Sequence, residues 1–470
     1  MGRFRGTLRQ MGNQQLTTAT IYNRAFSAKQ RTQGVHLRRG LTLAAAASIV
    51  LMIFTQPGCG GGNSSTTPTS GLQERAFVGV NLTNSGSIQI IDAEKDQITA
   101  SSITPISVSG FAILAPPPQI MIPGPNSTTI EYNSGDNNIN IIDNIKETQV
   151  AKIGSIDCTV SNGAGCQIQF AGSVDSLAAS SDGKFIYAAL SSNSEVSIAD
   201  LTGSSIPTPK NIPAVPGNCQ NTTDPTKSTC LPGARRIVLS HNNAKLLVFN
   251  ETLTQFEIVN TSDSSVQTVT GLDHPVYGVF SADDSKAYIL NCGAECGGTQ
   301  ASVVTVDMSS LAVSQPANVD AATIGIADTN NLYVAGSNPA TPGSGSVTVL
   351  PLSSLSAGKQ TKIGDGFHQV ISLFQGKVIV GARTCTTGCL SIVDPNAGTA
   401  IVDTPAAGEP QKGDVTAIAP ITPRKVFYTA EGGELRIYDA TTGIEELLNT
   451  APMIDIVGKV TSVLYVGPKT

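Results

Sequence analysis

The chain has 470 residues, of which 40 % are hydrophobic and only 14 % are charged, with 46 glycines and 26 prolines. This composition is typical of many short strands joined by turns, and it argues against a disordered protein. Eight basic residues and no acidic one lie in residues 1–58. Residues 59–470 therefore hold 21 of the 29 basic residues and all 35 acidic ones, which gives this part a net charge of −14. Because such a charge repels phosphate backbones, we expect no nucleic-acid partner.

The N-terminal segment has the pattern of an export signal. Arg38 and Arg39 precede an uncharged apolar run over residues 41–55, short for a bilayer span, which ends in Gln56-Pro57-Gly58-Cys59. A small residue before a cysteine resembles the lipobox of bacterial lipoproteins, although Gln56 stands where leucine is usual. The resemblance implies a signal peptide with a long basic leader (1–58), a lipid on Cys59 and a flexible tether (59–74). Ordinary cleavage nearby, or an uncleaved anchor, is the alternative.

Eight of the nine cysteines form local pairs, and the ninth is Cys59. The pairs are Cys158/Cys166, Cys219/Cys230, Cys292/Cys296 and Cys385/Cys389. In an exported chain such pairs predict disulfides. Zinc binding is the alternative, but no pair has the histidine or cysteine neighbours that would complete a tetrahedral shell. Short loops gain little entropy from a bridge, so we expect these disulfides to fix loops rather than to hold the fold together.

A unit of short strands recurs along the chain. Its clearest copy is residues 180–200 (SSDGKFIYAALSSNSEVSIAD), with a polar turn, a strand, a second turn and a strand that ends in aspartate. Taking this last strand as the third of each unit, we predict it at Ser87–Asp92, Asn138–Asp143, Glu195–Asp200, Gln255–Asn260, Ser302–Asp307, Ser346–Leu350, Leu390–Asp394 and Leu435–Asp439. Successive ends are 43 to 60 residues apart, which is the period of a four-stranded propeller blade with loop insertions.

The second strands of the units align equally well. We predict them at Phe77–Asn81, Thr128–Asn133, Phe185–Leu190, Leu246–Asn250, Ala287–Asn291, Leu332–Ala335, Val378–Ala382 and Val426–Ala430. The segment SSDGKFIYAAL resembles the core of YVTN-type propeller repeats, and SADDSKAYILN, SHNNAKLLVFN and FQGKVIVGA are more distant copies. The resemblance implies an all-β fold, a β-propeller of four-stranded blades, over residues 75–470.

Eight third strands predict eight blades, with seven blades and an irregular flank as the alternative. The C-terminal residues 462–466 have no third strand of their own. Pairing them with the N-terminal unit around Phe77 would close the ring and remove exposed sheet edges. We therefore expect N- and C-terminal strands to share a blade.

The four cysteine pairs all map to one face of such a propeller. Two pairs lie between second and third strands, and the other two precede the first strands that begin near Asp175 and Arg235. In propellers these two kinds of loop share a face. Stapled, elongated loops on a rigid scaffold favour a recognition surface, although durability outside the cell would explain the disulfides equally well.

Candidate ligand-binding residues lie at the starts of the first strands. Asp175, Arg235, His368 and Asp414 occupy equivalent positions near the entry to the central channel, and His274 lies slightly upstream. Such a ring of carboxylate, imidazole and guanidinium groups can hold an anionic ligand or a metal. Ordinary polar lining of a wet channel is the alternative. We predict no cofactor, with a metal ion in the channel as the alternative.

Catalytic motifs are scarce in this sequence. It has no phosphate-binding loop, no nucleophile elbow and no His-Glu-x-x-His. We therefore predict a binding or scaffold module for a protein or glycan partner in the cell envelope. The alternatives are a purely structural component, or an enzyme at the channel mouth, because lactonases and quinoprotein dehydrogenases have similar propellers. We expect a monomer anchored by lipid to the bacterial outer membrane, on its periplasmic or surface face.

Overall fold

The structure is a computed structural model. It describes residues 68–82, 85–103, 120–134, 137–150, 152–153, 155–157, 167–212, 234–356, 358–405 and 410–468, all within the unit Asn63–Thr470. The predicted signal segment, the lipidation site Cys59 and the cysteines Cys158, Cys166, Cys219 and Cys230 lie outside these residues.

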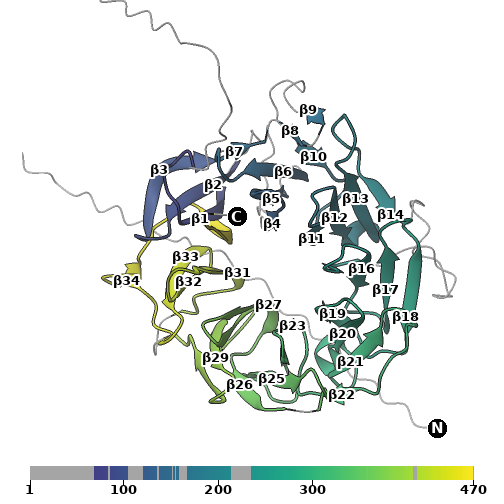
Figure 1. The fold of residues 1–470 in the computed structure, drawn as a ribbon. Coiled ribbons are helices and arrows are strands. Elements are labelled where there is room, and N and C mark those ends of the chain that lie inside the picture. The colour runs from purple at the N-terminus through teal and green to yellow at the C-terminus, as the bar shows by residue number, and fades with distance from the viewer. Residues whose placement is uncertain are drawn as a thin grey trace, which may run out of the picture. The chain divides into compact units, whose positions relative to one another are not determined.

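Eight antiparallel sheets follow one another along the unit and stand around a common centre, which makes it an eight-bladed β-propeller (Figure 1). Among the described residues six sheets have four strands, the second has five and the eighth has three. The predicted fold class is confirmed, and the seven-bladed alternative is wrong. In blades 2 to 8 the strands run from the centre outward in chain order, so the loops between second and third strands lie on the face opposite the turns between first and second strands.

The first four blades carry the longest insertions. Blade 1 contains β1 (Arg75–Leu82), β2 (Ser85–Asp92), β3 (Gln97–Ile103) and the C-terminal β36 (Lys459–Val466). Blade 2 contains β4 (Ile120–Gly124), β5 (Thr128–Asn133), β6 (Asn138–Asp143), β7 (Thr148–Gln149) and β10 (Gln167–Gln169), beside a small hairpin of β8 (Lys152–Ile153) and β9 (Ile156–Asp157). Blade 3 contains β11 (Ser176–Ala179), β12 (Phe185–Leu190), β13 (Glu195–Asp200) and β14 (Lys210–Ile212), with the 3-10 turn η1 (Ser191–Asn193). Blade 4 contains β15 (Arg236–Leu239), β16 (Lys245–Phe249), β17 (Gln255–Asn260) and β18 (Val266–Thr270).

The last four blades are more regular. Blade 5 contains β19 (Pro275–Phe280), β20 (Lys286–Asn291), β21 (Ser302–Asp307) and β22 (Ala317–Asn318), with the 3-10 turn η4 (Gly293–Cys296). Blade 6 contains β23 (Ile324–Ala327), β24 (Asn331–Ser337), β25 (Gly345–Pro351) and β26 (Gln360–Ile363). Blade 7 contains β27 (Phe367–Phe374), β28 (Lys377–Arg383), β29 (Leu390–Asp394) and β30 (Thr399–Val402). Blade 8 contains β31 (Val415–Pro420), β32 (Val426–Glu431) and β33 (Glu434–Asp439), followed by the hairpin of β34 (Leu447–Leu448) and β35 (Ala451–Pro452).

The core lies between blades rather than inside any one of them. Eight apolar clusters fill the eight interfaces between neighbouring blades. Successive side chains of each second strand point to opposite faces, so one strand supplies two interfaces. In β12, Ile186 and Ala188 pack against blade 2, while Tyr187 and Ala189 pack against blade 4. This two-sided burial explains why the second strands read as unbroken apolar runs.

The recurring polar turn of the sequence repeat is held in place by the hydrogen bonds of a serine. Ser180 Oγ donates to Asp182 Oδ1 and accepts the backbone N–H of Phe185 at 2.9 Å. The turns before β16 and β20 repeat this arrangement with Ser240 and Asn242, and with Ser281 and Asp283. Each serine therefore fixes the chain reversal between the first and second strands.

The ring closes in blade 1, where the C-terminal β36 is the innermost strand. It pairs antiparallel with β1 and places Leu464 opposite Phe77, which confirms the predicted closure. On the blade 8 side, Asp96 accepts hydrogen bonds from both terminal nitrogens of Arg424, at 2.7 Å for Nη2, and from Tyr428. Asp96 is 4 % exposed in this ion pair.

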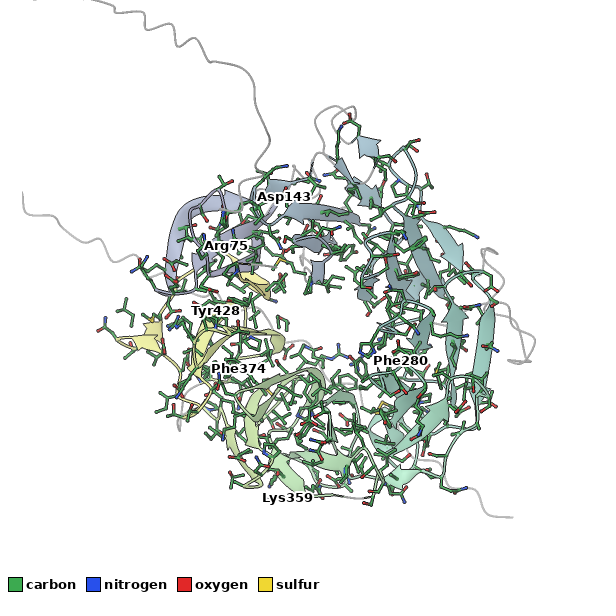
Figure 2. The ribbon with its side chains drawn as sticks, in the orientation of Figure 1. Arg75, Asp143, Phe280, Lys359, Phe374 and Tyr428 are labelled. Carbon is green, nitrogen blue, oxygen red and sulfur yellow. A yellow bond between two sulfur atoms is a disulfide. The ribbon has the colours of Figure 1, made fainter. Side chains whose placement is uncertain are left out.

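A second buried ion pair ties blade 1 to blade 2. Arg75, at the start of β1, is fully buried and pairs with Glu147 at 2.8 Å. Ser70 also donates to Glu147, and Thr69 donates its backbone N–H to Ile145. Figure 2 shows Arg75 and Tyr428 on the two blades that meet at the closure. Buried ion pairs thus lie on both sides of the blade that holds the ends together.

We predict that Asp96→Asn destabilises the propeller by about 2–4 kcal/mol, because Arg424 loses its buried counter-charge. The measurement is the free energy of unfolding in urea. The matched control is Asp263→Asn, in the exposed β17–β18 turn, where the carboxylate accepts hydrogen bonds from Ser265 of the same turn. Equal losses for the two variants would show that this ion pair does not hold the closure.

Candidate functional site

The stapled face is the face that carries the loops between second and third strands. In blade 5 this loop contains η4, and a disulfide joins Cys292 to Cys296. In blade 7 the equivalent loop carries the disulfide Cys385–Cys389. These two predicted disulfides are confirmed, and their short spans agree with a role in fixing loops.

An aspartate provides a second constraint on each of these two loops, in addition to the disulfide. Asp273 precedes β19 and accepts hydrogen bonds from Thr299 and Gln300, the latter at 2.8 Å. Asp365 precedes β27 and accepts hydrogen bonds from the backbone and side chains of Thr386 and Thr387. Burial raises the pKa of each carboxyl, but the hydrogen bonds outweigh it. The pKa of Asp365 falls to about 2, and that of Asp273 falls well below its usual range.

The five residues predicted at the channel entry lie at the starts of inner strands in five different blades. Asp175, Arg235, His274 and Asp414 directly precede β11, β15, β19 and β31, and His368 is the second residue of β27. No hydrogen bond or ion pair joins any two of these five described residues.

Each of the five interacts with nearby groups instead. Asp175 accepts the backbone N–H of Ser191, Arg235 pairs with Glu251 at 3.1 Å, His274 lies 3.0 Å from Asp273, and Asp414 accepts the backbone N–H of Thr384. The fifth, His368, is 1 % exposed, and burial lowers its pKa to about 4, so its ring is neutral. A bulge in β27 between His368 and Val370 accompanies this placement. Ligand binding by the five residues remains a prediction.

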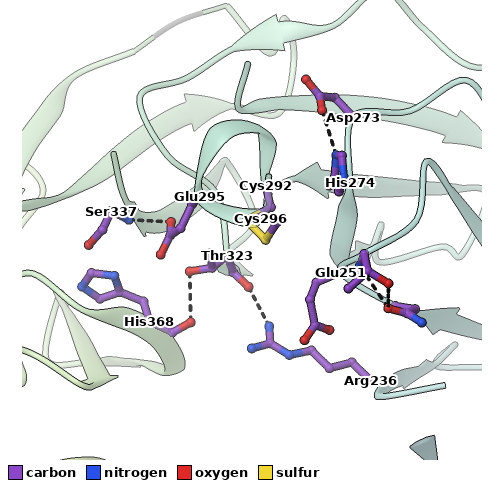
Figure 3. Close-up of a disulfide and its surroundings, with 12 residues drawn as sticks. Arg236, Glu251, Asp273, His274, Cys292, Glu295, Cys296, Thr323, Ser337 and His368 are labelled. Atoms are coloured by element: carbon purple, nitrogen blue, oxygen red, sulfur yellow. Dashed lines mark hydrogen bonds and ion pairs between the residues drawn. A yellow bond between two sulfur atoms is a disulfide. The ribbon is translucent and has the colours of Figure 1, made fainter. Parts of the chain in front are cut away.

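The sequence analysis missed Arg236, the neighbour of Arg235 and the first residue of β15. Its side chain reaches past blade 5, and Nη1 donates to the backbone carbonyl of Thr323 in blade 6 at 2.7 Å (Figure 3). Its Cζ atom lies 5.9 Å from the ring centroid of Tyr277 and 5.3 Å from that of Phe367 in blade 7. Arg236 therefore lies across the inner rim of four consecutive blades.

A second arginine stands against the same aromatic ring. Arg383 ends β28, is exposed, and has its Cζ atom 4.8 Å from the Phe367 centroid. We call Arg236 and Arg383 the arginine pair. The tandem Arg235-Arg236 was the available signal in the sequence, but it does not say which of the two reaches the inner rim.

Glu295 lies between the two cysteines of the η4 disulfide and completes this region. Its Oε2 accepts the backbone N–H of Ser337 at 2.8 Å, which joins blade 5 to blade 6 (Figure 3). Burial raises its pKa to about 7, although Ser337 and the charge of Arg236 act in the opposite direction. Glu295 therefore changes charge near neutral pH, beside a group that is always positive.

Two other features were sought in the part of the chain that the structure describes. No group of three or more histidine, cysteine, aspartate or glutamate side chains there is arranged to hold a metal ion. No helix there is long and apolar enough to cross a membrane. The arginine pair, Phe367, Tyr277 and Glu295 come together from blades 4, 5 and 7, and they are the candidate site that the geometry supports best.

We predict that Glu295→Gln changes the pH dependence of stability. The ordinary carboxyl pKa of 4.5 becomes about 7 in the folded protein, so the folded state binds the proton more tightly. Stability from this group is therefore present below pH 4.5 and is lost as pH rises through 7. The free energy of unfolding of the variant minus that of the wild type should be higher at pH 8 than at pH 4.5, by about 1–3 kcal/mol. The reason is that a shift of one pKa unit corresponds to about 1.4 kcal/mol.

Urea unfolding of both proteins at the two pH values measures this difference. The control is Glu94→Gln, in the exposed β2–β3 turn. A difference in unfolding free energy between variant and wild type that is the same at both pH values would contradict a raised pKa at Glu295.

Comparisons with known proteins support the fold and no more. No family model matches the chain, and no curated protein matches it. A solved dihydro-heme d1 dehydrogenase, NirN, in complex with DHE is 14 % identical over 86 % of this chain and 79 % of its own, with a TM-score of 0.53. Hydrazine synthase from Kuenenia stuttgartiensis is 13 % identical over 72 % of this chain and 100 % of its own, with a TM-score of 0.46. The β-propeller domain of Cps50 (Swd1) from Myceliophteria thermophila is 10 % identical over 70 % of this chain and 99 % of its own, with a TM-score of 0.47. The chain shares the β-propeller fold with the first of these.

Proposed function

We propose that the chain is an exported, lipid-anchored β-propeller that binds a protein or glycan partner in the cell envelope through its stapled face. The observation that carries the proposal is the double fixing of two loops on that face. Each loop is closed by a disulfide and also held by an aspartate that precedes the inner strand of its own blade.

Loops fixed in this way suit recognition. Ordering a loop on binding costs conformational entropy, and a loop that is already ordered avoids that cost. Two cross-links on one face also need an oxidising compartment, which supports export. The lipobox-like Gly58-Cys59 and the YVTN-like turns support an anchored repeat protein of the envelope.

We predict that Cys59→Ala releases the protein from membranes, because two or more acyl chains are needed for stable anchoring. The measurements are membrane fractionation and the mass of the N-terminal peptide of the mature chain. Thiol counting on denatured, unreduced protein should also find no free cysteine. A Cys59→Ala form that stays with membranes, and whose N-terminal peptide differs in mass from that of the wild type by the substitution alone, would refute the anchor.

We predict that a bulky charge on the stapled face abolishes partner binding, whereas the same change on the opposite face does not. Blade 5 offers a matched pair of exposed alanines, Ala294 in η4 and Ala282 in the β19–β20 turn. Purified wild type, Ala294→Arg and Ala282→Arg are titrated with solubilised envelope glycan and with envelope protein, in separate experiments. Binding that survives Ala294→Arg and is lost in Ala282→Arg would place the partner on the other face.

A further inference from the structure

The arginine pair differs from every other arginine that the structure describes. Six arginines follow Cys59, and all six are described. Four of them pair with carboxylates, namely Arg75 with Glu147, Arg235 with Glu251, Arg424 with Asp96, and Arg436 with Glu445. Arg236 and Arg383 have no such partner among the described residues, and both stand against Phe367.

The charges around the pair do not neutralise it. Glu251 is the nearest carboxylate on blade 4, but Arg235 already pairs with it. Glu295 accepts a backbone N–H from Ser337 and is partly protonated near neutral pH. Burial lowers the pKa of Arg236 and the neighbouring charge of Arg383 lowers it further, while Glu251 and Glu295 act in the opposite direction. Two cations close enough to repel one another form a local positive site in a chain whose exported part is strongly acidic.

The geometry leaves most of the donors unused. A guanidinium carries five N–H donors, and only Nη1 of Arg236 has a hydrogen-bond partner among the described residues. Arg383 has none there, and its side chain is exposed. Both Cζ atoms lie near one ring centroid, so they are at most 10.1 Å apart, the sum of 5.3 and 4.8 Å. One ligand the size of a few sugar units can therefore reach both.

We propose that the arginine pair binds the carboxylate groups of an acidic glycan, with the rings of Phe367 and Tyr277 beside the sugar. Planar guanidinium groups match carboxylates with two parallel hydrogen bonds. The rings of Phe367 and Tyr277 are partly exposed, and the parts that the guanidinium groups leave uncovered offer apolar surface to the C–H groups of a pyranose. Arg236 is only half-exposed, so a slender chain end reaches it more readily than the surface of a folded protein does. The proposal rests on the proposed function and names the class of partner.

The test is titration of the purified chain with trigalacturonate, an acidic trisaccharide, followed by calorimetry. The uncharged trisaccharide maltotriose and a hexaglutamate peptide are titrated in parallel. Arg236→Gln and Arg383→Gln each remove one guanidinium. Lys286→Gln makes the same charge change at an exposed residue on the opposite face of blade 5. Because Arg383 is exposed and has no hydrogen-bond partner among the described residues, its variant tests the site even if Arg236→Gln misfolds.

We expect trigalacturonate to bind the wild type and Lys286→Gln equally, and each arginine variant roughly tenfold or more weakly, because a charge-assisted hydrogen bond is lost. Added salt should weaken binding. Absence of binding up to about 1 mM, equal binding of maltotriose, or full binding by both arginine variants would overturn the proposal. Hexaglutamate binding without trigalacturonate binding would assign an acidic peptide instead. If envelope glycan binding depends on Ala294 but trigalacturonate does not bind, this inference fails and the proposed function stands.

Discussion

The structure depends on the packing of each blade against its two neighbours. A single four-stranded sheet has two apolar faces and can bury neither alone, so no blade is stable without the next. Because the second strand of every blade supplies side chains to both interfaces, a cavity made on one strand would loosen two clusters at once. Closure then removes the two ends at which such a stack would otherwise expose an apolar face.

Rigidity of this kind determines what the stapled face can do. The inner strands fix the positions at which Asp273 and Asp365 meet the loops of their blades. The disulfides hold the same loops from within, so each loop has two separate constraints. Arg236 benefits from this arrangement, because Thr323 and Phe367 come from neighbouring blades whose relative positions the interfaces set. A side chain that reaches across four blades keeps its place only on a stiff ring.

Much of the fold could be predicted from the sequence, because the second and third strands have period-two or fully apolar patterns and end in turn residues. The strands at Asn138–Asp143 and Glu195–Asp200 agree with the structure residue for residue. The site could not be predicted to the same depth. Bulges near the starts of β19, β27 and β31 shift the register, and a shift of one residue turns a side chain to the other face. His368 is buried beside such a bulge in β27. β15 has no bulge, and there Arg236 rather than Arg235 lies across the inner rim, because neighbouring residues of a strand point to opposite faces.

The position of β36 has a consequence for synthesis of the chain. Blade 1 receives its innermost strand from the C-terminal region, so β1 emerges from the ribosome long before the strand with which it must pair. Until then its inner edge is unpaired, and unpaired edges invite pairing with other chains. The pairing of β36 with β1 can therefore form only late in assembly. A propeller built in this way is expected to need chaperones that cover this edge during its biogenesis, and to complete its ring only after β36 has been synthesised.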